Sequence, residues 1–358
     1  MECKDIALTG DGEFLREFYK RSVQLRVPLS GSLEITSLCN LKCVHCYLGT
    51  DTPPERKALK EMSTAKILAV LDEITEAGCL DLLLTGGEPF LRKDFNIIYS
   101  HAKKNGLLVT VFSNGTLVTD KIVSLFEDLP PQAVEISLYG ATGETYEKIS
   151  GVRGSYDKCL KGIQLLLDAN INLKLKTILM TLNRHEFFLI ENFAKERGVK
   201  FRFDAMIFPK LNGDKSPIGL RISPEEAIEK EFSDNERFSQ WKKYFERLGP
   251  IQMEEALYSC GAGITGFHID ACGKLKPCLM TTSPEYDLKE GPFSIGWREV
   301  LPLIREKKPE NSFRCGTCSK APLCGYCPPF FALENGREDI CSEFLCEIGA
   351  NRFKKLHN

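Results

Sequence analysis

Short strand-like runs alternate with helix-like segments from residue 32 to about residue 205, and this alternation limits the possible folds more than any other feature. Because helices that separate successive strands join them in parallel, the pattern predicts a series of βαβ units. The units would build an open parallel sheet or a partial barrel, and in both architectures ligands bind at the carboxyl ends of the strands. The runs are SLEIT (32–36), DLLLT (81–85), LLVTVF (107–112), AVEISL (133–138), NLKLKTILM (172–180) and KFRFD (200–204).

The clearest helix-like segment is STAKILAVLDEITEAG, residues 63–78. Its apolar residues recur at helical spacing. Ser63 or Thr64 can cap the start, and Gly78 can close the end. The segment therefore predicts an amphipathic helix between the first two strands.

The charge balance gives no reason to expect nucleic acid or an anionic membrane as a partner. The chain of 358 residues has 47 basic and 49 acidic side chains, a net charge of -2. It contains no apolar run of membrane-spanning length and no secretion signal, so a cytosolic location is expected. In that compartment, 15 cysteines indicate metal ligands or reactive thiols rather than disulfides.

The composition changes along the chain and divides it into four predicted parts. A segment rich in Pro and Gly (207–226) is typical of a linker, and a charged helical stretch follows at roughly 224–247. Farther on, closely spaced cysteines and frequent turn residues predict a small domain held together by metal. The parts are an N-terminal extension (1–31), an α/β barrel domain (32–206), a linker with a helix (207–255) and a cysteine-rich domain (256–358).

Three cysteines lie close together just after the first predicted strand, in the sequence CNLKCVHCY. Three thiolates can bind three irons of a [4Fe–4S] cube and leave the fourth iron without a protein ligand, much as a catalytic zinc site keeps an open position. The spacing Cys39-x₃-Cys43-x₂-Cys46 allows one loop to wrap one such cube. A zinc loop or a ferredoxin-like electron-transfer segment is the alternative interpretation.

This loop resembles the signature of radical S-adenosylmethionine (SAM) enzymes. The resemblance implies a partial (β/α)6 TIM-like barrel and a [4Fe–4S] cluster whose open iron chelates the amino and carboxylate groups of SAM. In that family, one electron from the cluster cleaves the sulfonium, and the resulting 5′-deoxyadenosyl radical abstracts a hydrogen atom from substrate. Cys39, Cys43 and Cys46 would then be both metal ligands and catalytic residues, and an electron donor such as flavodoxin or ferredoxin is implied.

The end of the second predicted strand matches the family as well. LLLTGGEPFLR (82–92) contains the family's GGEP motif, so the resemblance implies that Gly86, Gly87 and Glu88 bind the methionine amino group. Two adjacent glycines also let the backbone approach a ligand closely. An ordinary strand-to-helix turn is the alternative.

Further cofactor-binding candidates come from the third strand and the cysteine loop. Ser113 and Asn114, in VFSNGT, stand where family members place polar residues near the ribose, although Asn-Gly is also a good turn. His45 takes the position of a loop aromatic residue that packs near adenine. The resemblance therefore implies that all three contact SAM.

Candidates for the carboxylate of SAM come from the fourth strand and the segment after it. Ser137, in EISLYG, and Arg153, in ISGVRGSYD, match family residues that hold the methionine carboxylate. Tyr139 stands where the family usually has an aspartate, which leaves the role of that acid open. Asp204 ends the sixth strand and could face substrate.

The later cysteines resemble the SPASM extension of radical SAM enzymes, which holds one or two auxiliary [4Fe–4S] clusters. The chain departs from the family in one spacing. Two residues separate Cys324 from Cys327, where the family more often has three before its sixth cysteine. Either Cys272 completes the nearer cluster, or one iron of that cluster is open to a substrate group. Cys341 is the alternative to Cys346 as a ligand of the farther cluster. A pair of structural zinc knots is the alternative to both clusters. The implied ligands are Cys260, Cys278 and Cys327 for the nearer cluster, and Cys315, Cys318, Cys324 and Cys346 for the farther one.

The first functional hypothesis is a peptide-modifying maturase, because most comparable SPASM enzymes act on peptides or proteins. Residues 1–31 are too few for a leader-binding module, so a separate leader-binding protein or a leader-independent substrate is expected. Sulfatase-type maturation is disfavoured, because Leu279 stands where that branch has an aspartate.

Two other hypotheses remain open. The second is an enzyme that oxidises or trims a small molecule in tetrapyrrole, other cofactor or natural-product synthesis. The third is a non-enzymatic iron–sulfur or zinc protein. The Gly86–Glu88 turn and the polar strand ends argue against the third, since an electron carrier needs no pocket for an amino acid.

Overall fold

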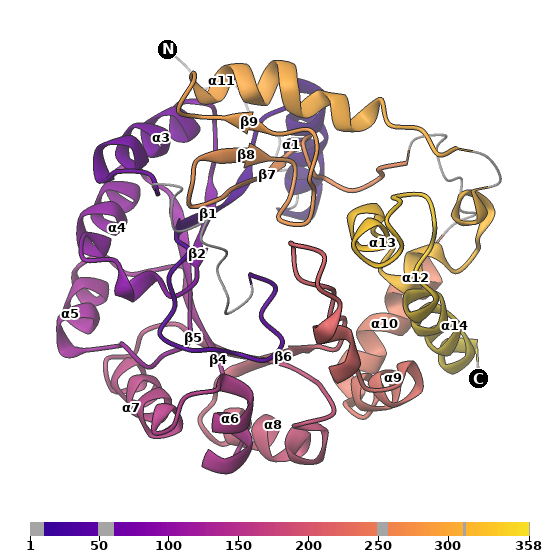
Figure 1. Cartoon of the computed structure of the whole chain (residues 1–358), viewed down its shortest axis with the longest axis horizontal. Coiled ribbons are helices and arrows are strands. Elements are labelled where there is room, and N and C mark those ends of the chain that lie inside the picture. The colour runs from indigo at the N-terminus through magenta and orange to yellow at the C-terminus, as the bar shows by residue number, and fades with distance from the viewer. Residues whose placement is uncertain (1–10, 49–60, 249–256, 311–312, 358) are drawn as a thin grey trace, which may run out of the picture.

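A nine-stranded sheet forms the centre of the protein (Figure 1). The computed structural model describes residues 11–48, 61–248, 257–310 and 313–357. Six strands run parallel in sequence order, and the sheet is not closed, because β6 and β9 are its edges. These strands confirm the six predicted runs. They are β1 (Ser30–Thr36), β2 (Asp81–Gly86), β3 (Leu108–Ser113), β4 (Ala133–Ser137), β5 (Leu173–Ile178) and β6 (Lys200–Asp204).

Helices cover the outer face of the parallel strands and form an arc around them, as Figure 1 shows. This confirms the predicted α/β partial barrel, in which each crossover between parallel strands carries a helix. The arc consists of α3 (Thr64–Glu76), α4 (Phe95–Lys104), α5 (Asp120–Asp128), α6 (Gly143–Ser150), α7 (Ser155–Asp168) and α8 (Phe187–Glu196).

The ends of α3 follow local sequence signals. The Ser63 hydroxyl accepts a hydrogen bond from the backbone amide of Lys66 at 3.2 Å and so caps the first turn. Gly78 follows the last turn with a φ of +98°, a conformation that favours glycine. The predicted helix over residues 63–78 is therefore confirmed to within two residues.

The charged stretch predicted as one helix over 224–247 is in fact two helices, α9 (Pro224–Phe232) and α10 (Asn235–Arg247). The break has a local cause. The Asp234 side chain accepts a hydrogen bond from the amide of Arg237 at 2.8 Å and starts a new helix there. The preceding segment contains the short helix η3 (Ser216–Leu220).

Three strands from the cysteine-rich part extend the barrel sheet, which the sequence did not predict. β7 (Gly266–Ile269) pairs in parallel with β1, and β8 (Lys274–Lys276) and β9 (Tyr286–Asp287) follow in antiparallel order. Runs of two to four residues are too short to show a period in the sequence. The division into four parts stays a prediction. The boundary predicted between residues 255 and 256 lies outside the described residues, and so do residues 1–10 of the predicted N-terminal extension.

Most of the helices in the C-terminal half lie together on one side of the barrel (Figure 1). Arg352 of α14 joins three of them: it binds the Glu231 carboxylate of α9 at 2.7 Å and the Leu323 carbonyl of α12 at 2.7 Å. The remaining α-helices are α1 (Asp11–Leu25), α11 (Phe293–Ile295), α12 (Ala321–Cys324), α13 (Pro328–Asn335) and α14 (Glu343–His357). The other short helices are η1 (Pro89–Leu91), η2 (Arg184–Glu186), η4 (Gly296–Val300), η5 (Leu301–Arg305) and η6 (Arg314–Thr317).

None of the helices in the described ranges has both the length and the apolar character that a membrane span requires.

The parallel strands separate apolar and polar side chains between their two faces. Leu33, Ile35 and Leu84 point outward and are fully buried under the helices. Because successive side chains of a strand alternate in direction, the residues between them point into the barrel. The inward set is largely polar, and it includes Ser32, Thr85, Ser137, Lys176, Arg202 and Asp204. The barrel interior is therefore built to bind a ligand.

The carboxylate of Glu186, in η2, ties the segment after β5 to the start of α6. It accepts hydrogen bonds from the Thr142 and Thr145 hydroxyls, each at 2.6 Å, and from the Ala141 amide at 2.6 Å. Burial by itself would raise the pKa of Glu186, but these hydrogen bonds outweigh it and hold the pKa below the usual 4.5.

We expect the Glu186 carboxylate to stabilise the fold above about pH 4.5 and to lose this contribution as the pH falls through its lower folded pKa. Glu186→Gln should lower the free energy of unfolding at pH 7 by about 1–3 kcal/mol. It should also flatten the fall in stability below pH 4.5. Urea unfolding between pH 3.5 and pH 7 measures both effects. Glu196→Gln, at an exposed residue of α8, is the control, and equal slopes for the two variants would contradict the prediction.

Candidate active site

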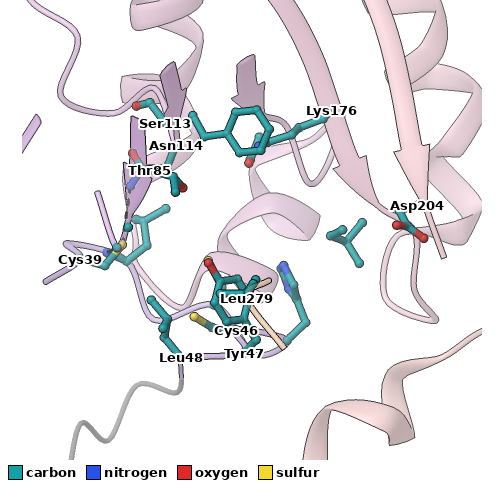
Figure 2. Close-up of a pocket in the computed structure, with 18 of the residues that line it drawn as sticks. Cys39, Cys46, Tyr47, Leu48, Thr85, Ser113, Asn114, Lys176, Asp204 and Leu279 are labelled. Carbon is teal, nitrogen blue, oxygen red and sulfur yellow. Dashed lines mark hydrogen bonds between the residues drawn. The ribbon is translucent and has the colours of Figure 1, made fainter. Parts of the chain in front are cut away.

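A cavity of about 400 Å³ lies inside the barrel, between the cysteine loop and the inward-facing side chains of the strands (Figure 2). It brings together nine of the eleven residues that the sequence predicted for the SAM site. Glu88 and Arg153 are the two that do not line it. The nine are Cys39, Cys43, His45, Cys46, Gly86, Gly87, Ser113, Asn114 and Ser137.

Close backbone contacts hold the cysteine loop against the end of β2. The Gly87 amide donates to the Thr36 carbonyl at 2.8 Å, and the Glu88 amide donates to the Leu38 carbonyl at 2.8 Å. A Cβ atom on Gly86 would lie 2.1 Å from the Thr36 oxygen, and one on Gly87 would lie 2.1 Å from the Leu38 oxygen. Glycine at both positions is therefore a steric requirement of the loop.

The three thiols of the loop lie close enough to repel one another when ionised. Burial raises the pKa of Cys39 to about 11, and the nearby Glu88 and Cys46 add to this. Burial, followed by Cys46 and Cys39, likewise raises the pKa of Cys43. A cationic group between the sulfurs would offset this repulsion and stabilise the thiolates.

The donor set fits a [4Fe–4S] cluster. The Leu41 amide donates to Cys39 Sγ at 3.4 Å, and the Asn114 side-chain amide donates to the same sulfur at 3.8 Å, contacts that stabilise a metal-bound thiolate. Within the described ranges, no three side chains of His, Cys, Asp or Glu converge closely enough to hold a single metal ion.

His45 is a neutral aromatic residue of the cavity wall. Burial lowers its pKa to about 4, so the imidazole carries no charge near pH 7. Its ring packs edge-on against Tyr139, with centroids 4.8 Å apart. Among the described residues, none forms a hydrogen bond with His45 Nδ1, which is buried. An uncharged ring with a buried acceptor or donor suits contact with a purine base.

Glu88 is fully buried beside the cavity rather than in its wall. Its two carboxylate oxygens accept hydrogen bonds from the Ser113 hydroxyl at 2.9 Å and from the Asn114 amide at 2.8 Å. Burial raises its pKa to about 7, although these hydrogen bonds oppose the shift. Glu88 therefore fastens the end of β3 to the turn after β2.

Asn114 connects the end of β3 to the cysteine loop. Its side-chain amide donates to Asn40 Oδ1 at 2.9 Å, and Asn40 in turn donates to the Thr116 hydroxyl at 2.8 Å. The sequence analysis did not single out Asn40, although it directly follows the first cysteine of the loop. These amides fix the position of Cys39 from the β3 side.

Arg153 is exposed in the turn between α6 and α7, outside the cavity wall. The same turn packs against the cysteine loop, because the Lys42 amide donates to the Ser150 carbonyl at 2.8 Å. The structure therefore brings the backbone near Arg153 to the loop but leaves the guanidinium outside the cavity.

The cavity wall also contains residues that the sequence analysis did not propose. Lys176 of β5, Arg202 of β6 and His268 of β7 line the cavity, together with Asp204, whose exposure to substrate was anticipated. The sequence did contain a partial signal for Lys176 and Arg202, because polar and apolar residues alternate in NLKLKTILM and KFRFD and so place the polar residues of each strand on one face. For His268 no signal existed, because β7 is too short.

The later cysteines form two groups in space. Burial raises the pKa of Cys327 to about 12, and Cys278 and Cys260 add to this, so these three thiols lie together. Burial also raises the pKa of Cys315 to about 12, and four further thiols add to it: Cys341, Cys346, Cys324 and Cys318. The first group contains the three cysteines that the resemblance implies for the nearer cluster, and the second contains the four implied for the farther cluster together with Cys341.

Cys272 lies at the opposite end of a hairpin from the first of these groups. It belongs to the turn between β7 and β8, whereas Cys260 precedes β7 and Cys278 follows β8. Leu279, next to Cys278, lines the cavity. The first thiol group is therefore adjacent to the site, and Cys272 is remote from that group.

Comparison with known proteins decides the family. The sequence profile of the Radical SAM superfamily matches residues 33–194. The chain carries a radical SAM domain and is an enzyme. This excludes the non-enzymatic alternative, and it agrees with the cysteine loop and the cavity beside it.

Relatives of this radical SAM enzyme cover most of its length. An AdoMet-dependent heme synthase of Methanosarcina barkeri is 27% identical over 82% of the chain and 89% of the relative. The antilisterial bacteriocin subtilosin biosynthesis protein AlbA of Bacillus subtilis is 27% identical over 90% of the chain and 72% of AlbA. The crystal structure of Streptococcus suis SuiB bound to precursor peptide SuiA has the same fold, with a TM-score of 0.72 at 17% identity over 97% of the chain and 84% of SuiB.

We expect Gly87→Ala to displace the cysteine loop, because the new methyl group would overlap the Leu38 carbonyl. The variant should lose most of its bound iron and about 1–3 kcal/mol of stability. Iron analysis and urea unfolding measure these effects. Gly219→Ala, where a Cβ atom meets no neighbour within 4 Å, is the control. Normal iron content in Gly87→Ala would show that the contact does not position the loop.

Proposed function

We propose that the chain is a radical SAM enzyme with a SPASM-type C-terminal part, and that it modifies a peptide. The observation that carries the proposal is the shared cavity: the three thiols of the cysteine loop and the glycine turn of β2 line one space with the polar end of β3. In this proposal Cys39, Cys43 and Cys46 hold a [4Fe–4S] cluster. Gly86 and Gly87 take the amino end of SAM, with Glu88 fixing their turn from behind the wall, and Ser137 takes its carboxylate. Arg153, which was also predicted for the carboxylate, lies outside the cavity and is left out of the proposal.

Bound to these three thiolates and reduced by an electron donor, a [4Fe–4S] cluster would supply the one electron that cleaves SAM to methionine and a 5′-deoxyadenosyl radical. The chain's own residues orient the reactants. Ser113 and Asn114 face the ribose, and the neutral His45 ring packs on the adenine. The apolar part of the wall, which includes Leu41 and Phe112, limits the access of water to the radical.

The two later thiol groups would hold auxiliary [4Fe–4S] clusters. The nearer set is proposed to be Cys260, Cys278 and Cys327. Cys315, Cys318, Cys324 and Cys346 are proposed for the farther set, with Cys341 as the alternative to Cys346. Because Leu279 joins Cys278 to the cavity wall, the nearer cluster would lie close enough to accept an electron after hydrogen abstraction.

The size of the cavity is compatible with a peptide substrate. About 400 Å³ is at the small end of ligand sites, so most of a peptide would lie outside the cavity. The relationship to AlbA, a bacteriocin biosynthesis protein, agrees with this. A separate leader-binding protein, and an electron donor such as flavodoxin or ferredoxin in the cytoplasm, complete the proposal.

A tetrapyrrole is the second candidate substrate. The observation that favours it is the alignment with the heme synthase of Methanosarcina barkeri, which spans 89% of that relative. One experiment distinguishes the peptide substrate from the tetrapyrrole substrate. The chain is expressed with each peptide encoded beside its gene, and separately supplied with iron coproporphyrin III, and the masses of the recovered compounds are compared.

We expect Cys43→Ala to abolish the conversion of SAM to 5′-deoxyadenosine, because the cluster would lose one of its three sulfur ligands. Cys324→Ala should leave part of this cleavage intact but stop product formation, because only the farther auxiliary cluster is affected. Anaerobic reconstitution followed by chromatography of 5′-deoxyadenosine measures the difference.

Cys79→Ala serves as the control, since this buried cysteine lies outside all three thiol groups and should affect stability alone, by about 1 kcal/mol. If Cys43→Ala and Cys324→Ala behave alike in folded protein, the division of labour between the clusters is wrong.

A further inference from the structure

Lys176 places an ammonium group in the cavity wall without a matching acid. Its Nζ lies 2.8 Å from the centroid of the Phe112 ring, and its side chain lines the cavity. Among the residues that the structure describes, none forms an ion pair or a hydrogen bond with Nζ. A cation whose direct contact is an aromatic face can still bind an anionic partner.

A second cation lies over the same ring. The Arg202 Cζ atom is 5.5 Å from the Phe112 centroid, and Arg202 is the cross-strand neighbour of Lys176. Arg202 binds one oxygen of Glu135 through Nη2 at 2.7 Å and Nε at 3.1 Å. The other Glu135 oxygen lies 3.8 Å from the Lys174 ammonium. One carboxylate thus pairs with two cations, Arg202 and Lys174, and forms no ion pair with Lys176.

We propose that Lys176 and Arg202 bind a carboxylate of the substrate. The proposal rests on the proposed function, since it assumes that SAM and substrate share this cavity. It narrows the substrate to a compound with a carboxylate near the reacting carbon, such as an acidic residue or the C-terminus of a peptide. A carboxylate between the two cations would complete a charge-paired cluster.

The protonation of Lys176 supports this assignment. Burial lowers its pKa well below the usual 10.5; Glu135 and Glu88 oppose the shift, and Arg202 adds to it. A carboxylate at Nζ would raise this pKa again. An acidic ligand would therefore favour the charged form of Lys176.

SAM carries a carboxylate too, but its expected position differs. A SAM carboxylate that chelates the cluster iron has to lie at the cysteine loop. Figure 2 shows Lys176 and Asp204 across the cavity from Cys39. The geometry therefore favours the substrate as the source of the carboxylate.

The first measurement tests whether the carboxylate at this subsite comes from SAM or from the substrate, by calorimetric titration of reconstituted holoenzyme with SAM. Lys176→Gln removes the charge, Lys176→Arg keeps it, and Lys174→Gln removes a neighbouring cation that is paired with Glu135. We expect all three variants to bind SAM within about threefold of the wild type, a difference below 1 kcal/mol. A loss of SAM affinity of tenfold or more in Lys176→Gln alone would assign the subsite to SAM and overturn the proposal.

The second measurement locates the subsite directly in crystals of SAM-loaded wild-type holoenzyme. The crystals are soaked with 4-bromobenzoate or with its neutral isostere 4-bromobenzamide, and bromine is located by its anomalous signal. We expect the benzoate carboxylate between Lys176 and Arg202, and no benzamide there. In solution, Lys176→Gln should weaken benzoate binding by roughly tenfold or more, the effect of losing a charge-assisted hydrogen bond, and Lys176→Arg should retain it.

Absence of benzoate from this position, or equal binding of benzamide, would overturn the proposal while leaving the proposed function intact. Failure of the wild-type holoenzyme to bind and cleave SAM would instead refute the proposed function. Because the wild-type crystals need no variant, misfolding of Lys176→Gln does not affect the result.

Discussion

The active site depends on the close approach of two backbone segments, the cysteine loop after β1 and the glycine turn after β2. The contact leaves no room for a Cβ atom on Gly86 or Gly87, and two backbone hydrogen bonds of 2.8 Å hold it. Loop position, thiol position and the opening of the cavity all follow from this contact. Asn114 and the end of α6 support the loop from its other sides, so the thiols are held by rigid elements rather than by the loop alone.

The sheet divides its two faces between stability and chemistry. Apolar residues of the strands pack under the helices, and this burial supplies the main stabilising free energy of the barrel. The inner face carries charges that would be unfavourable in a closed core, such as Glu135, Lys176 and Arg202. Perturbed charged groups of this kind are typical of functional sites, and the two cations beside Phe112 are the basis for the proposed anionic substrate group.

The cysteine-rich part is joined to the barrel more closely than its composition indicates. β7 adds to the barrel sheet beside β1, and Ser32 shares a hydrogen bond of 2.8 Å with His268 across 236 positions of sequence. The first later thiol group lies next to the cavity through Leu279. An auxiliary cluster in that position could influence substrate directly, whether the substrate is a peptide or a tetrapyrrole.

The sequence by itself determined the strand–helix alternation, the cysteine loop and nine residues of the cavity, because periodicity and spacing are local and consecutive parallel strands end at one edge. It did not reveal the pairing of β7 with β1, the exposure of Arg153, the remoteness of Cys272 or the cationic wall of β5 and β6. Only the tertiary structure decided these, because they depend on the register and direction of segments far apart in the chain. The alternation of polar and apolar residues along β5 determines which side chains share a face, but only the pairing of β5 with β4 and β6 places Lys176 beside Arg202 in the cavity.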